Sequence, residues 1–197
     1  YALKKFGIEE PDLDKLEPFV GPPLKDSFRE FYGFPEEELD KAVVYYRERY
    51  APIGVLENQI YPGMAQMLAK LCEKGIHLAV ASSKPTEFVC QILAHFEIEQ
   101  YFEVIVGSGM DGSRTTKEEV VEEALSQLGL LSLPRKERKE ICAMIGDRKF
   151  DIQGAKAYGL TGVGVTFGYA GEGELEAEGA DYLIDSVEEL GTFLTQE

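Results

Sequence analysis

The sequence predicts an α/β fold: a three-layer core in which helices cover both faces of a parallel sheet, preceded along the chain by a small all-helical domain. Two observations carry this prediction. From residue 58 onward, short apolar segments alternate with segments of helical periodicity, and parallel strands need helical crossovers of this kind. Before residue 58, no segment reads as a strand. We therefore expect a helical domain over residues 1–57 and an α/β core domain over residues 58–197.

The composition favours a cytoplasmic protein without a nucleic acid or membrane partner. The 197 residues carry a formal net charge of −16, which disfavours binding to nucleic acid or to an anionic membrane and favours divalent cations at any carboxylate cluster. The three cysteines are scattered without metal-ligand spacing and fit reduced thiols. No apolar run approaches the ~20 residues of a membrane-spanning helix, and no secretory signal is visible. We expect a monomer or homodimer.

The helical domain divides into short helices separated by glycine and proline. Residues 1–6 look like the end of a helix that stops at Gly7. The turn Gly21-Pro22-Pro23 precedes a helix with apolar residues at spacings of four and three, namely Leu24, Phe28 and Phe31. After a second break, residues 36–50 are expected to form a longer amphipathic helix.

The core domain contains five apolar segments of strand length, at residues 76–81, 102–106, 141–145, 161–165 and 182–184. Segments with helical periodicity lie before, between and after these strands, at residues 62–74, 84–96, 117–128, 151–158 and 186–194. Glycine-rich or polar segments read as loops, at residues 107–116, 130–140 and 168–179. Strands that alternate with helices in this way predict a parallel sheet.

The stretch from residue 141 to 165 reads as strand, acidic turn, helix and strand, and it places Asp147 at the carboxyl end of a strand. Ligands of open parallel sheets collect at that edge, where a carboxylate suits a hard cation or a cation-bound phosphate. An equally simple interpretation makes Asp147 the N-cap of the following helix. Asp151, four residues further on, is more simply a structural residue than a metal ligand.

Two further strand ends carry groups that suit a phosphoryl site. Ser82 follows the apolar Val80-Ala81 and could donate to a phosphate oxygen beside free backbone N–H groups, although a helix cap explains it as well. Lys117 begins a helix, where its charge opposes the helix dipole and suggests an anion within reach; a solvated lysine is the plainer explanation. A hydroxyl, an ammonium and a carboxylate at neighbouring strand ends supply a donor, a charge neutraliser and a cation ligand.

These residues belong to segments that resemble the motifs of a known family. In order along the chain, three segments are similar to motifs two, three and four of the haloacid dehalogenase superfamily, in its phosphoglycolate phosphatase-like branch: Ser82-Ser83-Lys84-Pro85, Asp111-Gly112-Ser113-Arg114 with Lys117, and Gly146-Asp147-Arg148-Lys149-Phe150-Asp151. No single motif is specific, but their order and spacing cover nearly the full chain. The resemblance implies a Rossmann-like core, and the helical domain with Val20-Gly21-Pro22-Pro23-Leu24 resembles the family's cap.

The resemblance also implies a magnesium-dependent phosphatase that works through an aspartyl-phosphate. Carried over by position, Asp147 would bind Mg²⁺ with Asp151 in support. Lys117 would offset charge on the nucleophile and the phosphate, and Ser82 with the Ser83 backbone would hold the phosphoryl group. The cap would select a small phosphomonoester as it closes over the site. Its candidate substrate contacts, of which the three bases are more simply solvated, are Gly21, Lys25, Arg47 and Arg49.

The family's first motif, Asp-x-Asp-Gly-Thr, does not occur in these 197 residues. In the family it follows a strand that lies between the two strands ending here at Ser82 and Asp147, and it holds the nucleophile and the acid/base aspartate. Without that strand its neighbours would stand roughly 10 Å apart with unpaired backbone groups. We therefore expect the strand and both aspartates to lie upstream of Tyr1, which is not an initiator methionine.

Two alternatives stay open. Phosphoglucomutase-like members of the superfamily, which are sugar-phosphate mutases, often carry an acidic residue before the metal-binding aspartate, where this chain has Gly146. A non-catalytic regulator that binds a phosphate metabolite is favoured only by the absent first motif. For the preferred enzyme, the expected substrates are small phosphate esters such as phosphoglycolate, or nucleotides.

Overall fold

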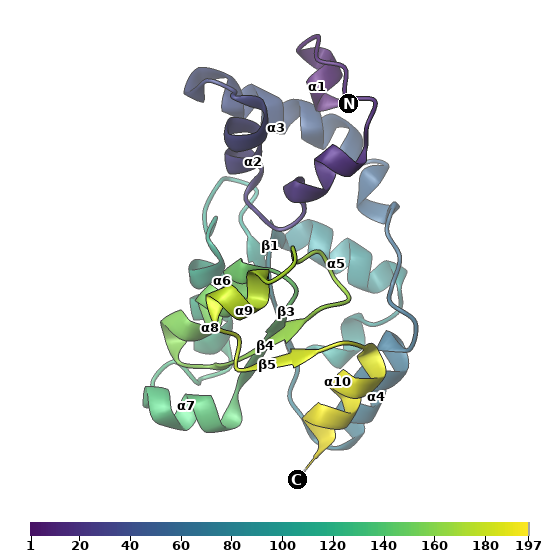
Figure 1. Cartoon of the computed structure of the whole chain (residues 1–197). Coiled ribbons are helices and arrows are strands. Elements are labelled where there is room, and N and C mark those ends of the chain that lie inside the picture. The colour runs from purple at the N-terminus through teal and green to yellow at the C-terminus, as the bar shows by residue number, and fades with distance from the viewer. Residues whose placement is uncertain (197) are drawn as a thin grey trace. The chain divides into compact units, whose positions relative to one another are not determined.

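The computed structural model describes residues 1–196, and the chain separates into two compact units between Asn58 and Gln59. Residues 1–58 form a helical unit, coloured purple to blue in Figure 1. Its helices are α1 (Ala2–Lys5), α2 (Leu24–Tyr32) and α3 (Glu36–Tyr50), with 3-10 turns at Asp14–Phe19 and Gly54–Leu56.

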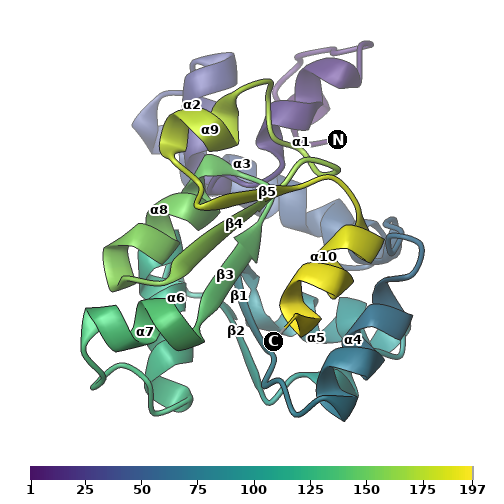
Figure 2. The ribbon, with the colours of Figure 1, turned by 60° about the horizontal axis from the view of Figure 1, so that its bottom comes forward.

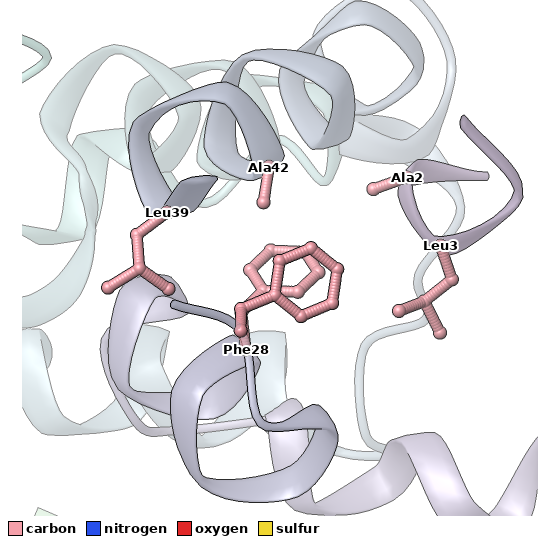
Figure 3. Close-up of a cluster of buried hydrophobic side chains, with 6 residues drawn as sticks. Ala2, Leu3, Phe28, Leu39 and Ala42 are labelled. Atoms are coloured by element: carbon pink, nitrogen blue, oxygen red, sulfur yellow. The ribbon is translucent and has the colours of Figure 1, made fainter. Parts of the chain in front are cut away.

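A single apolar cluster holds the helical unit together. Phe28 of α2 is only 2% exposed and lies among Leu39 and Ala42 of α3 and Ala2 and Leu3 of α1, as Figure 3 shows. Burying a phenylalanine side chain contributes roughly 1.5–3 kcal/mol to stability. Because all three helices contribute to this cluster, the helical unit has a core of its own.

Terminal residues explain where α2 ends and where α3 begins. α2 ends at Gly33, whose φ of 65° lies in the left-handed region that commonly ends helices. α3 carries Glu36, Glu37 and Glu38 in its first turn, where the positive end of the helix dipole favours acidic side chains.

Residues 59–196 form an α/β unit in which every paired strand is parallel to its neighbour. β1 (Ala79–Pro85) pairs with β2 (Val104–Ser108). β4 (Thr161–Val165) pairs with β3 (Ala143–Gly146) on one side and with β5 (Tyr182–Ile184) on the other. The registers place the first residue of β1 opposite the first of β2, and likewise for β3 and β4.

Helices cover both faces of these strands, as Figure 2 shows. α6 (Lys117–Gln127) and α8 (Lys149–Tyr158) lie on one face, and α4 (Met64–Glu73), α5 (Thr86–His95) and α10 (Val187–Thr195) lie on the other. Successive strand residues point to opposite faces, so that β2 packs Val104 and Val106, its first and third residues, against α6 and Ile105 against α5. This three-layer arrangement confirms the predicted fold class.

The strands of this unit fall into two sheets because β1 and β3 are not hydrogen-bonded to each other within residues 1–196. No residue of β1 or β3 is buried, whereas β2 and β4 contain mostly buried residues. In a continuous sheet ordered β2-β1-β3-β4, the two inner strands would be the most buried. The edges of β1 and β3 that face away from their partners therefore have no paired strand among the described residues.

Two segments expected to be loops contain helices, and both expectations were wrong. Residues 130–140 enter α7 (Arg135–Ile141), whose inward residue is Arg138, 6% exposed, with Nη1 donating to the Leu131 carbonyl at 2.8 Å. An arginine can bury its aliphatic stem in place of an apolar side chain, which conceals the helical periodicity. Residues 168–179 contain α9 (Glu174–Glu178), a single short helix anchored by one buried leucine.

The first strand of the α/β unit also differs from its expected bounds of residues 76–81. β1 begins at Ala79 and continues through Pro85, with a register irregularity after Ala81. A proline lacks the N–H that a strand ladder uses, so its position suggested a helix start. Here Pro85 ends the strand and α5 begins directly after it.

None of the helices formed by residues 1–196 combines the length and the apolar character that crossing a membrane requires.

Candidate active site

Asp147 directly follows β3 and touches the segment after β4. Its Oδ2 accepts a hydrogen bond from the backbone N–H of Tyr169 at 2.9 Å. A Cβ on Gly168 would lie 2.2 Å from the Asp147 Cβ, so only glycine permits this approach. Oδ1 of Asp147 has no hydrogen-bond partner among the described residues. The carboxylate is thus held through one oxygen while the other is available to a ligand.

Asp151 lies in the first turn of α8 and is 6% exposed. Its Oδ2 accepts from the backbone N–H of Arg148 at 3.0 Å, and its Oδ1 forms an ion pair with Lys117 Nζ at 2.8 Å. Gly146 makes room for it, because a Cβ there would lie 2.2 Å from the Asp151 Cβ. Both Asp151 oxygens are therefore already engaged within the protein.

Lys117 begins α6 and crosses from that helix to two other elements. Its Nζ donates to the Ala81 carbonyl of β1 at 3.0 Å in addition to its ion pair with Asp151, and its side chain is 12% exposed. Gly154 of α8 leaves space for its stem, since a Cβ there would lie 2.9 Å from the Lys117 Cγ. An ammonium this buried needs its partners, because desolvation of an unpaired charge is expensive.

The helix start that carries Lys117 is stabilised independently of that lysine. Thr116 and Glu119 form a reciprocal capping box, in which the Thr116 hydroxyl accepts from the Glu119 N–H and the Glu119 carboxylate accepts from the Thr116 N–H. Glu118 adds a second acid to the first turn. These acids offset the unfavourable interaction of Lys117 with the helix dipole.

Ser82 and Ser83 lie half-buried near the carboxyl end of β1. Ser82 Oγ accepts from the Lys84 backbone N–H at 3.2 Å, and the Ser83 carbonyl accepts from the Ser108 hydroxyl at 2.9 Å. A Cβ on Gly107 would lie 2.3 Å from the Lys84 carbonyl oxygen, so β2 packs tightly against the end of β1. These contacts restrain the end of β1, and the Ser82 hydroxyl can still donate its own proton.

The carboxyl edges of β1 and β3 thus bring together the sequence-predicted core residues. Lys117 joins the two edges, because it binds the residue before Ser82 and the aspartate four residues after Asp147. The cap candidates lie in the other unit: Lys25 pairs with Asp40 at 2.6 Å, and Arg49 pairs with Glu57 at 2.5 Å. Gly21 adopts a φ of 111° in the turn before α2.

Sequence reasoning missed a further acidic residue beside these groups. Glu174, the first residue of α9, accepts from the backbone N–H of Lys149 at 2.7 Å and from Arg148 Nε at 3.0 Å. Burial opposes the ionisation of Glu174, but these donors and the Gly171 N–H outweigh it and hold its pKa below the usual value. The signal available in the sequence was a glycine-rich segment placed directly after a strand at the ligand-binding edge.

The donor set suits a hard divalent cation of the Mg²⁺ type. Among residues 1–196, no group of three or more histidine, cysteine, aspartate or glutamate side chains is arranged to hold a metal. Mg²⁺ does not need such a cage, since it retains waters and binds through one or two carboxylates together with substrate phosphate. Asp147, with its available Oδ1, fits as a direct ligand, and Asp151 fits as its neighbour.

Comparisons with known proteins identify the family. The family model described as haloacid dehalogenase-like hydrolase matches residues 1–165. A 5'-nucleotidase of Pseudomonas aeruginosa is 42% identical over 90% of this chain and 77% of its own length. The crystal structure of a predicted phosphatase from Clostridium acetobutylicum superposes with a TM-score of 0.91 at 43% identity, covering 98% of this chain and 87% of that one.

A relative named as a kinase is also similar. The tyrosine-protein kinase PtkA of Mycobacterium tuberculosis is 40% identical over 86% of this chain, which spans only 55% of the length of that protein. Phosphoglycolate phosphatases stand among the more distant relatives. With the sheet, the three motifs and these matches together, the chain belongs to the haloacid dehalogenase-like hydrolases, in the branch that resembles phosphoglycolate phosphatases.

Proposed function

We propose that this protein is a Mg²⁺-dependent phosphatase that hydrolyses a small phosphomonoester, phosphoglycolate-like or a nucleotide, through an aspartyl-phosphate. The observation that carries the proposal is the largely buried Lys117 ammonium, held between the Ala81 carbonyl and Asp151, four residues along the chain from Asp147 with its available oxygen. A fixed cation and a carboxylate at the same ligand-binding edge of a parallel sheet suit a phosphoryl group bound with a metal ion.

Each residue of the site has a distinct role in this proposal. Asp147 binds Mg²⁺, which when present neutralises phosphoryl charge and orients the group. Asp151 fixes Lys117 and the first turn of α8, and so supports Asp147. Lys117 offsets negative charge on the nucleophile and the phosphoryl oxygens. Ser82 donates its hydroxyl to a phosphoryl oxygen, with the Ser83 backbone beside it.

The nucleophile in this proposal is an aspartate of an Asp-x-Asp segment, on a strand that lies between β1 and β3. The edges of β1 and β3 that have no strand partner among the described residues support such a neighbour. Its carboxylate oxygen attacks phosphorus, the bond to the leaving oxygen breaks, and the second aspartate protonates that oxygen. The same aspartate then takes a proton from water, which attacks phosphorus and releases inorganic phosphate and the free carboxylate.

We also propose that the helical unit acts as the cap that selects the substrate, with Gly21, Lys25 and Arg49 as its contacts. Lys25 and Arg49 are exposed and paired only with exposed acids, and such pairs contribute little to stability. Either base can therefore exchange its carboxylate partner for an anionic substrate group at small cost.

The test is release of inorganic phosphate by the full-length protein from a panel of esters, with Mg²⁺ or with a chelator. The panel contains 2-phosphoglycolate, nucleoside monophosphates and glucose 1-phosphate. Phosphate release that requires Mg²⁺ and is abolished in Asp147→Asn supports the proposal.

Two other outcomes would contradict it. Conversion of glucose 1-phosphate to its 6-phosphate isomer without phosphate release would identify a mutase. Saturable ester binding without turnover in the wild-type protein would identify a phosphate-metabolite-binding regulator.

A further inference from the structure

Glu174 links the two segments that flank Asp147. Its Oε1 accepts from the Lys149 backbone N–H at 2.7 Å and from Arg148 Nε at 3.0 Å, which ties it to the start of α8. Its Oε2 accepts from the Gly171 N–H at 3.2 Å, which ties it to the segment after β4. One carboxylate therefore closes the loop of residues 168–173 and holds that loop against the turn that carries Asp147.

Low exposure to solvent and a position at a helix N-terminus both strengthen the interactions of Glu174. The Glu174 and Arg148 side chains are 17% and 13% exposed, so their ion pair is shielded from water and salt much better than a surface pair. The Lys149 N–H belongs to the first turn of α8, where unpaired N–H groups and the positive end of the helix dipole favour a carboxylate. Glu174 therefore satisfies a helix terminus as well as a guanidinium.

The loop that Glu174 holds is the one that orients Asp147. The Tyr169 N–H donates to Asp147 Oδ2, and Gly168 packs directly against the Asp147 Cβ. If the loop moves, this hydrogen bond breaks and the carboxylate is free to rotate. Asp147 itself follows a strand end, so the loop is its principal side-chain restraint among the described residues.

We propose that Glu174 is a positioning residue, which acts through Arg148, Lys149 and the loop of residues 168–173 to keep the Asp147 carboxylate in the orientation that binds the divalent cation. This inference rests on the proposed function, because it assumes that Asp147 is a metal ligand. Groups that orient a metal ligand typically change metal affinity 10–100-fold when they are replaced.

The test compares Glu174→Gln and Glu174→Ala with the wild-type full-length protein in two measurements. The first is hydrogen exchange of the Tyr169 amide without metal, which reports on the loop alone. The second is Mn²⁺ affinity, measured from free Mn²⁺ by electron paramagnetic resonance well below the unfolding temperature of every variant. We expect several-fold faster exchange at Tyr169 and a Kd for Mn²⁺ that rises roughly 10-fold or more.

Glu176→Gln is the matched control. Glu176 lies in the same helix, is exposed, and loses the same charge on substitution, but no described residue bonds to its side chain. Its exchange and its Mn²⁺ affinity are expected to equal those of the wild type.

The remaining outcomes separate the possible failures. Unchanged Tyr169 exchange in both Glu174 variants would overturn the link. Faster exchange with unchanged Mn²⁺ affinity would reduce Glu174 to a structural residue and overturn its positioning role. Wild-type protein that binds no Mn²⁺, yet shows Tyr169 exchange that depends on Glu174, would overturn the proposed metal site and the positioning role that rests on it.

Discussion

The Lys117–Asp151 pair is the residue-scale feature on which the site depends most. The two side chains are 12% and 9% exposed, so each charge relies on the other in place of water. The Ala81 carbonyl is the second acceptor for the ammonium, and the Arg148 N–H is the second donor to the carboxylate. The pair therefore fixes the ammonium between β1 and α8, and loss of either partner would leave a largely buried charge without its counter-charge.

Replacing Lys117 alone should both destabilise and inactivate the protein. Lys117→Met leaves Asp151 buried without its counter-charge, and removing one partner of a buried pair costs about 3–5 kcal/mol. The double variant Lys117→Met, Asp151→Asn carries neither charge and should recover part of that stability. Urea unfolding measures the stability of the single and the double variant, and neither variant should release phosphate. A single variant as stable as the wild type would contradict the pairing.

At the scale of elements, the candidate site consists of strand ends, a helix start and a loop, which glycines allow to approach one another. Gly107 lets β2 pack against the end of β1, Gly146 makes room for Asp151, and Gly168 makes room for Asp147. A Cβ added at any of these three glycines would lie less than 2.5 Å from its nearest neighbouring atom, so no larger residue fits without a shift of the surrounding structure. Local backbone approach, rather than side-chain identity alone, therefore shapes the site.

Gly168→Ala should disturb the site because the new methyl group overlaps the Asp147 side chain. We expect a stability loss of about 1–3 kcal/mol and a large fall in phosphate release. Gly171→Ala, in the same loop, is the control, since its Cβ would lie 3.7 Å from its nearest neighbour, the Glu174 Oε2. Equal activity of the two variants would show that the loop tolerates the overlap.

The opposite edge of the sheet offers a pH-dependent contact between elements. Lys139 of α7 donates to both oxygens of Asp181, at 2.6 and 2.8 Å, and the Gly162 N–H of β4 donates to Oδ2 at 2.8 Å. The Lys139 ammonium and then the Gly162 N–H hold the pKa of Asp181 below its usual value.

Because the pKa of Asp181 is lower in the folded state, its ionised carboxylate stabilises the fold at pH values above its ordinary pKa of about 3.9. This contribution is lost as the pH falls through the pKa of Asp181 in the folded state. Asp181→Asn should therefore be less stable than the wild type at pH 6, and the difference should shrink toward pH 3. Urea midpoints across this range measure it. A difference independent of pH would contradict an ionised Asp181, and Glu176→Gln serves as the control for a lost surface charge.

At the scale of the whole molecule, each unit is supported by buried apolar residues of its own. The helical unit is built around Phe28, and the α/β unit around residues such as Leu71 and Val163, each 0–2% exposed. Because each unit is compact and contains buried apolar clusters of its own, we propose that each unit keeps its own stability.

Replacing a large buried side chain by alanine in one unit should therefore destabilise that unit and leave the other protected. Phe28→Ala should cost roughly 3–5 kcal/mol and raise hydrogen exchange within residues 1–58, while β4 remains protected. Leu71→Ala should show the reverse pattern. Hydrogen exchange resolved along the full-length chain measures both, and loss of protection throughout the molecule in either variant would show that the two units unfold together.

Sequence patterning was sufficient for the layers and for most element bounds, because apolar periodicity and terminal residues act locally. Residues 36–50, 161–165 and 182–184 match α3, β4 and β5. The motifs around Ser82, Lys117 and Asp147 likewise indicated a phosphoryl site, since their residue types carry its chemistry. α7 escaped detection because its inward position is an arginine, and α9 because a single leucine anchors it.

Pairings between distant residues required the folded chain. The sequence assigned a loop to residues 168–179, and only packing brings Glu174 of that segment onto the first turn of α8 and Tyr169 onto Asp147. Likewise, no local pattern predicts that Lys117 spans from α6 to β1 and α8. These contacts join residues that are 22 to 36 positions apart, and their formation depends on burial and geometry that exist only once both faces of the sheet are covered.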